Sequence, residues 1–366
     1  MGLRAATPLV VLLLASPVLR GQTAPPPLAS TNAAAATTLP AIPKSTAPAS
    51  TPDAPKDPTP KSRVLFFYTA PRSSVEMEVH TVPPTDTARL DRLRAAFQAA
   101  DCGGAHMQEQ PVTARRGGAG TNLICTWPGE SNAGTIVVAA HYEHDGKGEG
   151  ALADWSGAAL LPFLYQAIQG QARENNFVFL ESWKSAGVET WLKSLPREQR
   201  KNIRAMIDVD ALGLGVTRYF TTFSFMETTP PASLHMQAQL LWAAIDDGFN
   251  DPPKPTNPHR WLSVDNTDAF RAMMIPTIVI HSVPPESEHV PGSAADTAAS
   301  VDGNAYFQSY HLLCTYLASL DHMARRLALN DPYWNVVPGQ DIRPEDETPQ
   351  VTFRNIQRGH LAPAGH

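Results

Sequence analysis

Apolar segments of strand length alternate with segments of helical periodicity over residues 87–329. Short β-branched and aromatic runs such as 135–141 predict buried strands, and an apolar residue at every third or fourth position predicts the helices between them. Strands that alternate with helices pair mostly in parallel and are covered on both faces. We therefore expect one three-layer α/β/α domain over residues 63–345, with a mixed, mostly parallel sheet. The expected strands are 122–127, 135–141, 177–180, 203–210 and 277–281, and the expected helices are 87–100 (capped by Asp86), 156–169, 234–246, 268–273 and 304–329.

The first 62 residues have a composition that cannot form a core. Residues 1–22 carry an early Arg4, an apolar run and then small residues, which is the layout of a secretory signal peptide. The apolar run is far shorter than the roughly 20 residues of a membrane-spanning helix. Residues 23–62 are rich in Pro, Ala and Thr and predict a disordered linker, and residues 346–366 predict a loose tail. We expect an exported protein, secreted or periplasmic, without a transmembrane segment.

The charge balance argues against a nucleic-acid partner. The chain has 29 basic and 35 acidic residues, a formal net charge of -6. A surface that binds a phosphate backbone needs a concentration of Lys and Arg, which this balance does not favour.

Three cysteines in an exported chain indicate one disulfide and one free thiol. We favour a disulfide between Cys102 and Cys125, because Cys314 lies in an apolar helical run where a buried thiol is expected. The alternative is that all three cysteines are reduced and buried.

Polar residues follow several of the predicted strands. His141 follows one apolar run, Asp208 and Asp210 end another, Asp154 precedes a helix, and His289 lies in the loop after the last strand. Each has an ordinary structural explanation, such as a buried histidine or a carboxylate at a helix N-terminus. Because strand ends converge at one edge of such a sheet, the set also fits a zinc site, since zinc prefers His and Asp ligands.

The order of the motifs resembles metallopeptidase family 28, which includes two-zinc aminopeptidases, glutamate carboxypeptidase-like enzymes and glutaminyl cyclases. The resemblance spans roughly residues 100–325, and it implies a secreted hydrolase in which two zinc ions hold the attacking water. By resemblance, His141 matches the first histidine ligand, Asp210 the strand-end aspartate and His289 the late histidine ligand. The motifs that carry it are 134–144, 154–157, 177–180, 206–210, 270–276, and 289–291 with 296–297.

Two positions depart from the family pattern. The bridging acid is expected at Ala153, whereas the aspartate is Asp154, one place later. The family's adjacent pair of glutamates, which supplies the general base and a ligand, is absent, because Glu181 is followed by Ser182 and then Trp183 and Lys184. Glu181 is therefore the candidate for the base, and Glu143 is the alternative.

Three further residues are expected behind the ligands. Glu143 stands where the family has an aspartate that orients the first histidine, and it is joined by His144 and Asp208.

These departures weaken the predicted chemistry. Two dications a few ångströms apart repel strongly unless carboxylates lie between them, so we expect at most one zinc ion, held by His141, Asp210 and either Asp154 or His289, or no zinc at all. We predict a zinc-dependent, aminopeptidase-like hydrolase of weakened or altered activity, with a peptide or small amide as substrate. The alternative is a catalytically inactive pseudo-peptidase that binds a peptide or another partner.

Overall fold

The computed structural model describes residues 63–114, 117–130, 134–144, 147–221, 231–246, 248–256, 265–327 and 351–357. The predicted signal peptide (1–22) and linker (23–62) lie outside these residues. No helix among the described residues has the length and apolar character needed to cross a membrane.

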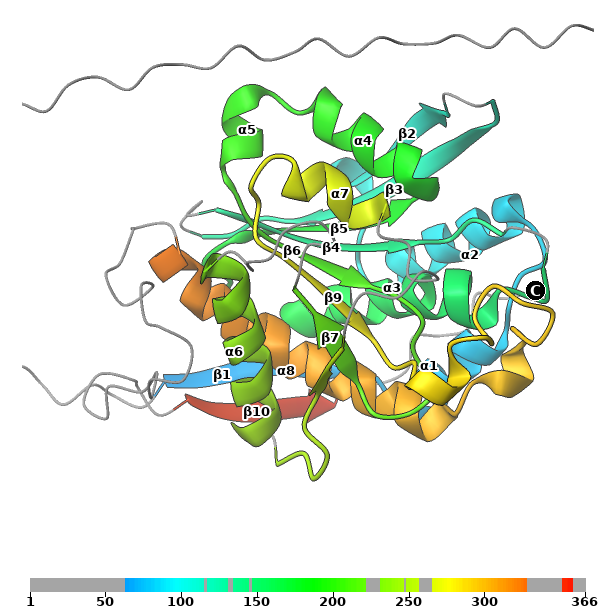
Figure 1. Cartoon of the computed structure of the whole chain (residues 1–366). Coiled ribbons are helices and arrows are strands. Elements are labelled where there is room, and N and C mark those ends of the chain that lie inside the picture. Colours follow the sequence, from blue (N-terminus) through cyan, green and yellow to red (C-terminus); the bar gives the residue numbers. More distant parts are fainter. Residues whose placement is uncertain are drawn as a thin grey trace, which may run out of the picture. The chain divides into compact units, whose positions relative to one another are not determined.

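The centre of the fold is a mixed sheet of eight strands. The four middle strands, β5, β4, β6 and β9, run in parallel, and β3 and β7 pair antiparallel to them on either side. The predicted α/β class with a mixed, mostly parallel sheet is confirmed (Figure 1). In sheet order the strands are β2 (Met107–Thr113), β3 (Ala119–Trp127), β5 (Asn176–Ser182), β4 (Thr135–His141), β6 (Ile203–Val209), β9 (Thr277–His281), β7 (Arg218–Phe220) and β8 (Lys254–Pro255).

Helices cover both faces of the sheet, because the middle strands are apolar on both sides. On β4, Ile136 and Val138 pack into one core cluster, whereas Val137 and Ala139 pack into the other. The helices over the larger cluster are α1 (Arg72–His80), α2 (Asp86–Ala99), α3 (Ser156–Ile168), α6 (Pro231–Asp246) and α8 (Gly303–Leu327). The helices over the smaller cluster are α4 (Lys184–Ser194) and α7 (Asp265–Arg271). The short helix α5 (Arg197–Lys201) follows α4.

Helix α2 is a predicted element whose cap differs from the prediction. Its N-cap is Thr85, whose side chain accepts a hydrogen bond from Ala88 N, and Asp86 is the first helical residue. Thr85 has the extended backbone that an N-cap needs, so its hydroxyl can satisfy a free amide. Asp86 is thereby released for contacts with other parts of the fold.

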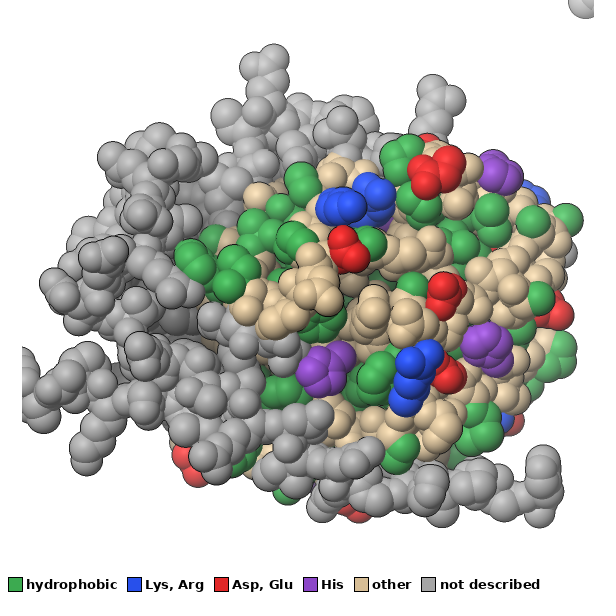
Figure 2. Space-filling view, turned by 90° about the horizontal axis from the view of Figure 1, so that it is seen from below, with side chains coloured by type: hydrophobic (Ala, Val, Ile, Leu, Met, Phe, Trp, Pro, Cys, Tyr) green, Lys and Arg blue, Asp and Glu red, His purple; other side chains and the backbone are tan. Residues whose placement is uncertain are grey.

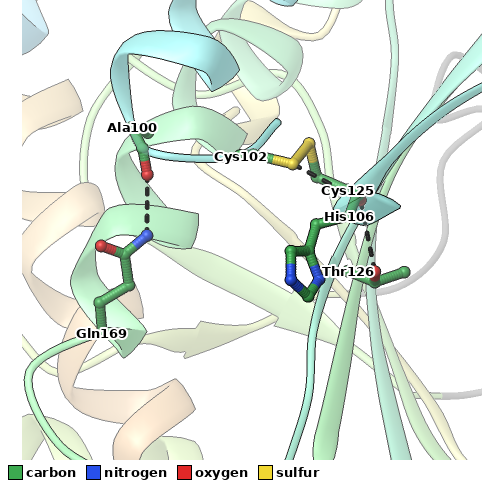
Figure 3. Close-up of a disulfide and its surroundings, with 6 residues drawn as sticks. All are labelled: Ala100, Cys102, His106, Cys125, Thr126 and Gln169. Carbon is green, nitrogen blue, oxygen red and sulfur yellow. Dashed lines mark hydrogen bonds between the residues drawn. A yellow bond between two sulfur atoms is a disulfide. The ribbon is translucent and has the colours of Figure 1, made fainter. Parts of the chain in front are cut away.

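The disulfide between Cys102 and Cys125 is present, and Cys314 is buried and not part of it. The bond ties the segment after α2 to β3, as Figure 3 shows. Nearby, Gln169 donates a hydrogen bond to the carbonyl oxygen of Ala100 at 2.8 Å. This bond joins the two cysteines that the sequence analysis favoured.

A second, two-stranded sheet joins β1 (Arg63–Thr69) in parallel to β10 (Val351–Gln357). Part of the range predicted as a loose tail is therefore a strand, paired with the start of the domain (Figure 1). On the face shown in Figure 2, the coloured acidic and basic side chains are interspersed with apolar and uncharged ones.

Candidate functional site

The carboxyl ends of the middle strands bring several sequence-predicted residues together. His141 is the last residue of β4, Glu181 lies one residue before the end of β5, and Asp210 directly follows β6. All three are buried, with exposed fractions of 8%, 0% and 4%. Parallel strands deliver such side chains to one edge of a sheet, so the strand pattern correctly located this region.

Asp154 reaches the same region through a π-helical turn, η2 (Ala151–Trp155), in which Trp155 N donates to Gly150 O at 3.0 Å. A π turn holds one residue more than an α turn, which changes the direction of the following side chains. Asp154 Oδ1 lies 3.9 Å from His141 Nδ1. The aspartate therefore lies beside the histidine despite its displacement from the family position.

The carboxylate of Asp296 fixes this turn. It accepts hydrogen bonds from Leu152 N at 2.6 Å and from Ala153 N at 3.1 Å. Asp296 also accepts from Gly292 N at 2.8 Å, so it joins the loop before α8 to the turn that carries Asp154.

The His141 ring lies between acidic side chains. Its Nε2 is 3.5 Å from Asp210 Oδ1, and its Nδ1 is 3.2 Å from Glu143 Oε2. Burial alone lowers the pKa of His141, but Glu143 and Asp210 outweigh burial and raise that pKa well above its usual value. Burial has the opposite effect on Glu143 and raises its pKa, but the charge of His141 outweighs burial and lowers that pKa below the usual value. Each member of the pair thus favours the charged form of the other.

A buried arginine also occupies this region. Arg89 of α2 is 0% exposed, and its Nη1 is 3.9 Å from Asp154 Oδ2. Burial raises the pKa of Asp154 to about 7, against the opposing charges of His141 and Arg89. Burial also lowers the pKa of Arg89, with Asp154 the strongest opposing charge.

Glu181 is fully buried, and neither carboxylate oxygen has a hydrogen-bond partner among the described residues. Burial raises its pKa well above the usual value, and only the charge of His141 opposes this effect. The raised pKa favours the protonated form of this carboxyl group, and in that form it cannot accept a proton.

The next three residues take other roles. Ser182 Oγ donates to Ala140 O at 3.2 Å, and Trp183 Nε1 donates to Asp86 Oδ2 at 2.9 Å. Lys184 has a φ of 60° and its backbone N donates to Glu143 Oε2 at 3.3 Å. The segment that the family resemblance associates with a glutamate pair is thus used for contacts within the fold.

The remaining predicted residues, His144, Asp208 and His289, differ in their contacts. His144 Nδ1 is 3.6 Å from Asp154 Oδ2, and its backbone N donates to Asp86 Oδ1 at 2.9 Å. Asp208 is 1% exposed and acts electrostatically on Arg271 of α7. His289 is exposed between the short helices η3 (Pro285–Ser287) and η4 (Ala298–Ser300), so its role as a ligand stays a prediction.

A zinc ion can be tested against these donors. His141 Nε2 has no hydrogen-bond partner in the described part of the chain, and its 3.5 Å spacing from Asp210 Oδ1 suits two ligands of one tetrahedral ion. Asp154, however, contacts the ring at Nδ1, 3.9 Å from its Oδ1, and not at the Nε2 that faces Asp210. Among the described residues, no group of three or more His, Cys, Asp or Glu side chains could hold a metal ion. As arranged, these residues do not fit zinc.

Sequence reasoning missed Arg89, Asp86 and Asp296 as members of the site. For Arg89 a signal existed, because it is four residues before Leu93 and eight before Phe97, on the buried face of α2. An arginine on an apolar helix face needs a partner inside the protein. Asp86 had no comparable signal, and Asp296 was noted only within the motif 289–297, because the contacts of both aspartates form only in the folded chain.

A family comparison now gives these observations a context. Residues 122–314, more than half of the chain, match the model of Peptidase family M28. The chain belongs to peptidase family M28. A comparison with curated proteins gives no match.

Several solved structures resemble the fold of this chain. The aminopeptidase LapA of Legionella pneumophila is 14% identical with a TM-score of 0.54, over 68% of this chain and 71% of that one. The glutaminyl cyclase of Porphyromonas gingivalis is 17% identical with a TM-score of 0.52, over 67% of this chain and 96% of that one. The chain spans about half the length of a zinc aminopeptidase from Bacillus subtilis, at 15% identity, 54% coverage of this chain, 50% of that one and a TM-score of 0.47.

Proposed function

We propose that this chain is an exported member of peptidase family M28 that recognises a peptide or a small amide but hydrolyses it weakly. The carrying observation is the arrangement around His141: its two ring nitrogens face different carboxylates, and no third donor completes a metal site among the described residues. Zinc aminopeptidase activity in this family depends, by resemblance, on ligands that these positions do not provide. Export rests on the N-terminal sequence alone.

Two replacements support weak hydrolysis. Ala153 stands at the position of the bridging acid and Ser182 at that of a glutamate, and neither side chain can balance a dication. Loss of a general base typically costs a factor of about 100 to 10,000 in rate. We therefore expect an aminopeptidase rate at least about 100-fold below that of a two-zinc family member.

The test is an assay of the purified full chain with peptides and aminoacyl anilides, combined with a measurement of bound zinc. The expected result is less than one zinc per chain, a low rate, and retained peptide binding. His141→Ala should abolish the residual rate, whereas the exposed control Glu198→Gln should leave it unchanged. A rapid rate that a chelator abolishes and zinc restores would overturn the proposal.

A second candidate is a hydrolase with one zinc ion and Glu181 as its base. It is favoured by the two oxygens of Glu181, which lack hydrogen-bond partners in the described part of the chain although the charge of His141 reaches them. Bound zinc at one per chain, together with a metal-dependent rate that Glu181→Gln removes, would select this candidate over the first.

A further inference from the structure

Arg89 makes several hydrogen bonds near His141 and Asp154, at the carboxyl ends of the middle strands. Its Nε donates to Pro83 O at 3.1 Å, Nη1 to Tyr142 O at 3.1 Å, and Nη2 to Glu149 O at 2.6 Å. A longer contact of 3.4 Å joins Nη1 to Glu143 O. One guanidinium therefore holds both arms of the loop that runs from His141 to Asp154.

The charge of Arg89 has acidic neighbours on several sides. Asp154, Asp86, Asp296 and Glu143 all act on it electrostatically. Its guanidinium carbon also lies 5.9 Å from the centre of the Trp155 ring, in the geometry of a cation–π contact. These neighbours come from α2, the loop after β4, the π turn and the loop before α8, so the arginine is where the site's elements meet.

We infer that Arg89 is the built-in cation of this site, which holds the loop from His141 to Asp154 and balances Asp154 in place of a metal ion. This inference rests on the proposed function, in which the family's zinc chemistry is weakened. An ion bound to Asp154 Oδ2 would lie no farther than about 6 Å from Arg89 Nη1, given a metal–oxygen bond of about 2 Å and the 3.9 Å separation. The charge of Arg89 therefore repels a zinc ion at Asp154, and the same charge balances the Asp154 carboxylate without the ion.

The geometry also explains why this cation is an arginine. The planar guanidinium has donors in several directions, and here they reach carbonyl oxygens of four residues. Lysine would keep the charge but has a single nitrogen, so it cannot hold the same set of carbonyls. The charge and the hydrogen bonds of Arg89 can thus be separated experimentally.

The experiment compares the full chain with Arg89→Met and Arg89→Lys, using urea unfolding and titration with zinc chloride. Arg89→Met should unfold at lower urea and bind zinc at least about tenfold more tightly than the wild type, because a repulsive charge is gone. Arg89→Lys should also lose stability, yet its zinc affinity should stay that of the wild type. Arg92→Met is the control, since Arg92 lies on the same helix and pairs with Glu78.

Two results of these measurements would overturn the inference about Arg89. Equal zinc affinity of the wild type and Arg89→Met would overturn the inference, as would equal stability of Arg89→Met and Arg92→Met. If Arg89→Met does not fold alone, zinc should restore a cooperative transition, and failure to do so counts against a balancing role. Efficient hydrolysis by the wild type would instead overturn the proposed function. The two failures can be told apart, because the hydrolysis assay uses the wild type alone and the inference about Arg89 is tested by comparing the zinc affinities of variants.

Discussion

Replacement of Glu181 by glutamine tests the electrostatic state of the site. The native carboxyl group is buried and its pKa is raised well above 4.5, whereas in the unfolded chain water solvates the carboxylate. Above pH 4.5 the unfolded state therefore loses this proton while the native state keeps it, so Glu181 makes the wild type less stable as pH rises. Glu181→Gln removes that pH dependence.

The magnitude follows from one proton. Each pH unit corresponds to about 1.36 kcal/mol, so between about pH 5.0 and about pH 6.5 the free energy of unfolding of Glu181→Gln should rise relative to the wild type by about 2 kcal/mol. The buried amide of glutamine adds a cost of its own, but this cost is the same at both pH values and cancels in the comparison.

The assay is urea unfolding of both proteins at the two pH values under non-oxidising, non-reducing conditions. Glu198→Gln is the control, because the Glu198 side chain is 80% exposed and water solvates it in both states. If the difference between Glu181→Gln and the wild type is the same at both pH values, Glu181 is ionised in the native protein. That result would contradict the reasoning above and favour its use as a base.

Three other measurements probe the fold and the site. Replacement of Cys102 and Cys125 by alanine should lower the free energy of unfolding by about 3 kcal/mol, because the disulfide closes a loop with a sequence separation of 23; urea unfolding measures the loss. Gly120→Ala should cost about 1 to 3 kcal/mol, since its new Cβ would lie 2.1 Å from the Trp183 ring, whereas Gly103→Ala meets nothing within 4 Å and should be neutral in the same assay. Treatment with a chelator should leave the thermal midpoint of the full chain unchanged, and a clear fall in that midpoint would show that a metal ion supports the native state.

The elements that the sequence predicted well are those that bury long apolar runs. β4 and β9 match the expected bounds, because their β-branched residues are buried on both faces and polar residues mark their ends. β2 was not predicted, since it has Pro111, only one fully buried residue and a partner on one side alone. The two-residue strand β8 carries too little pattern to be recognised.

The site was predicted in part for a related reason. His141 and Asp210 lie where buried strands stop, so local sequence was enough to locate them. The burial of Arg89 could be predicted from its spacing to Leu93 and Phe97, but its contact with Asp154 depends on where α2 packs in the folded protein. The raised pKa of Glu181 is also a property of its burial in the folded protein, and it could not be predicted from the residue's neighbours in sequence.

The parallel pairing of β1 with β10 has a practical consequence for shortened versions of the protein. A recombinant chain that stops before Val351 would leave the backbone amides and carbonyls of β1 without their partner strand. A strand with unpaired backbone groups can pair with a strand of another chain, so we expect such a truncated protein to self-associate. A version intended for crystallisation should therefore extend at least to Gln357.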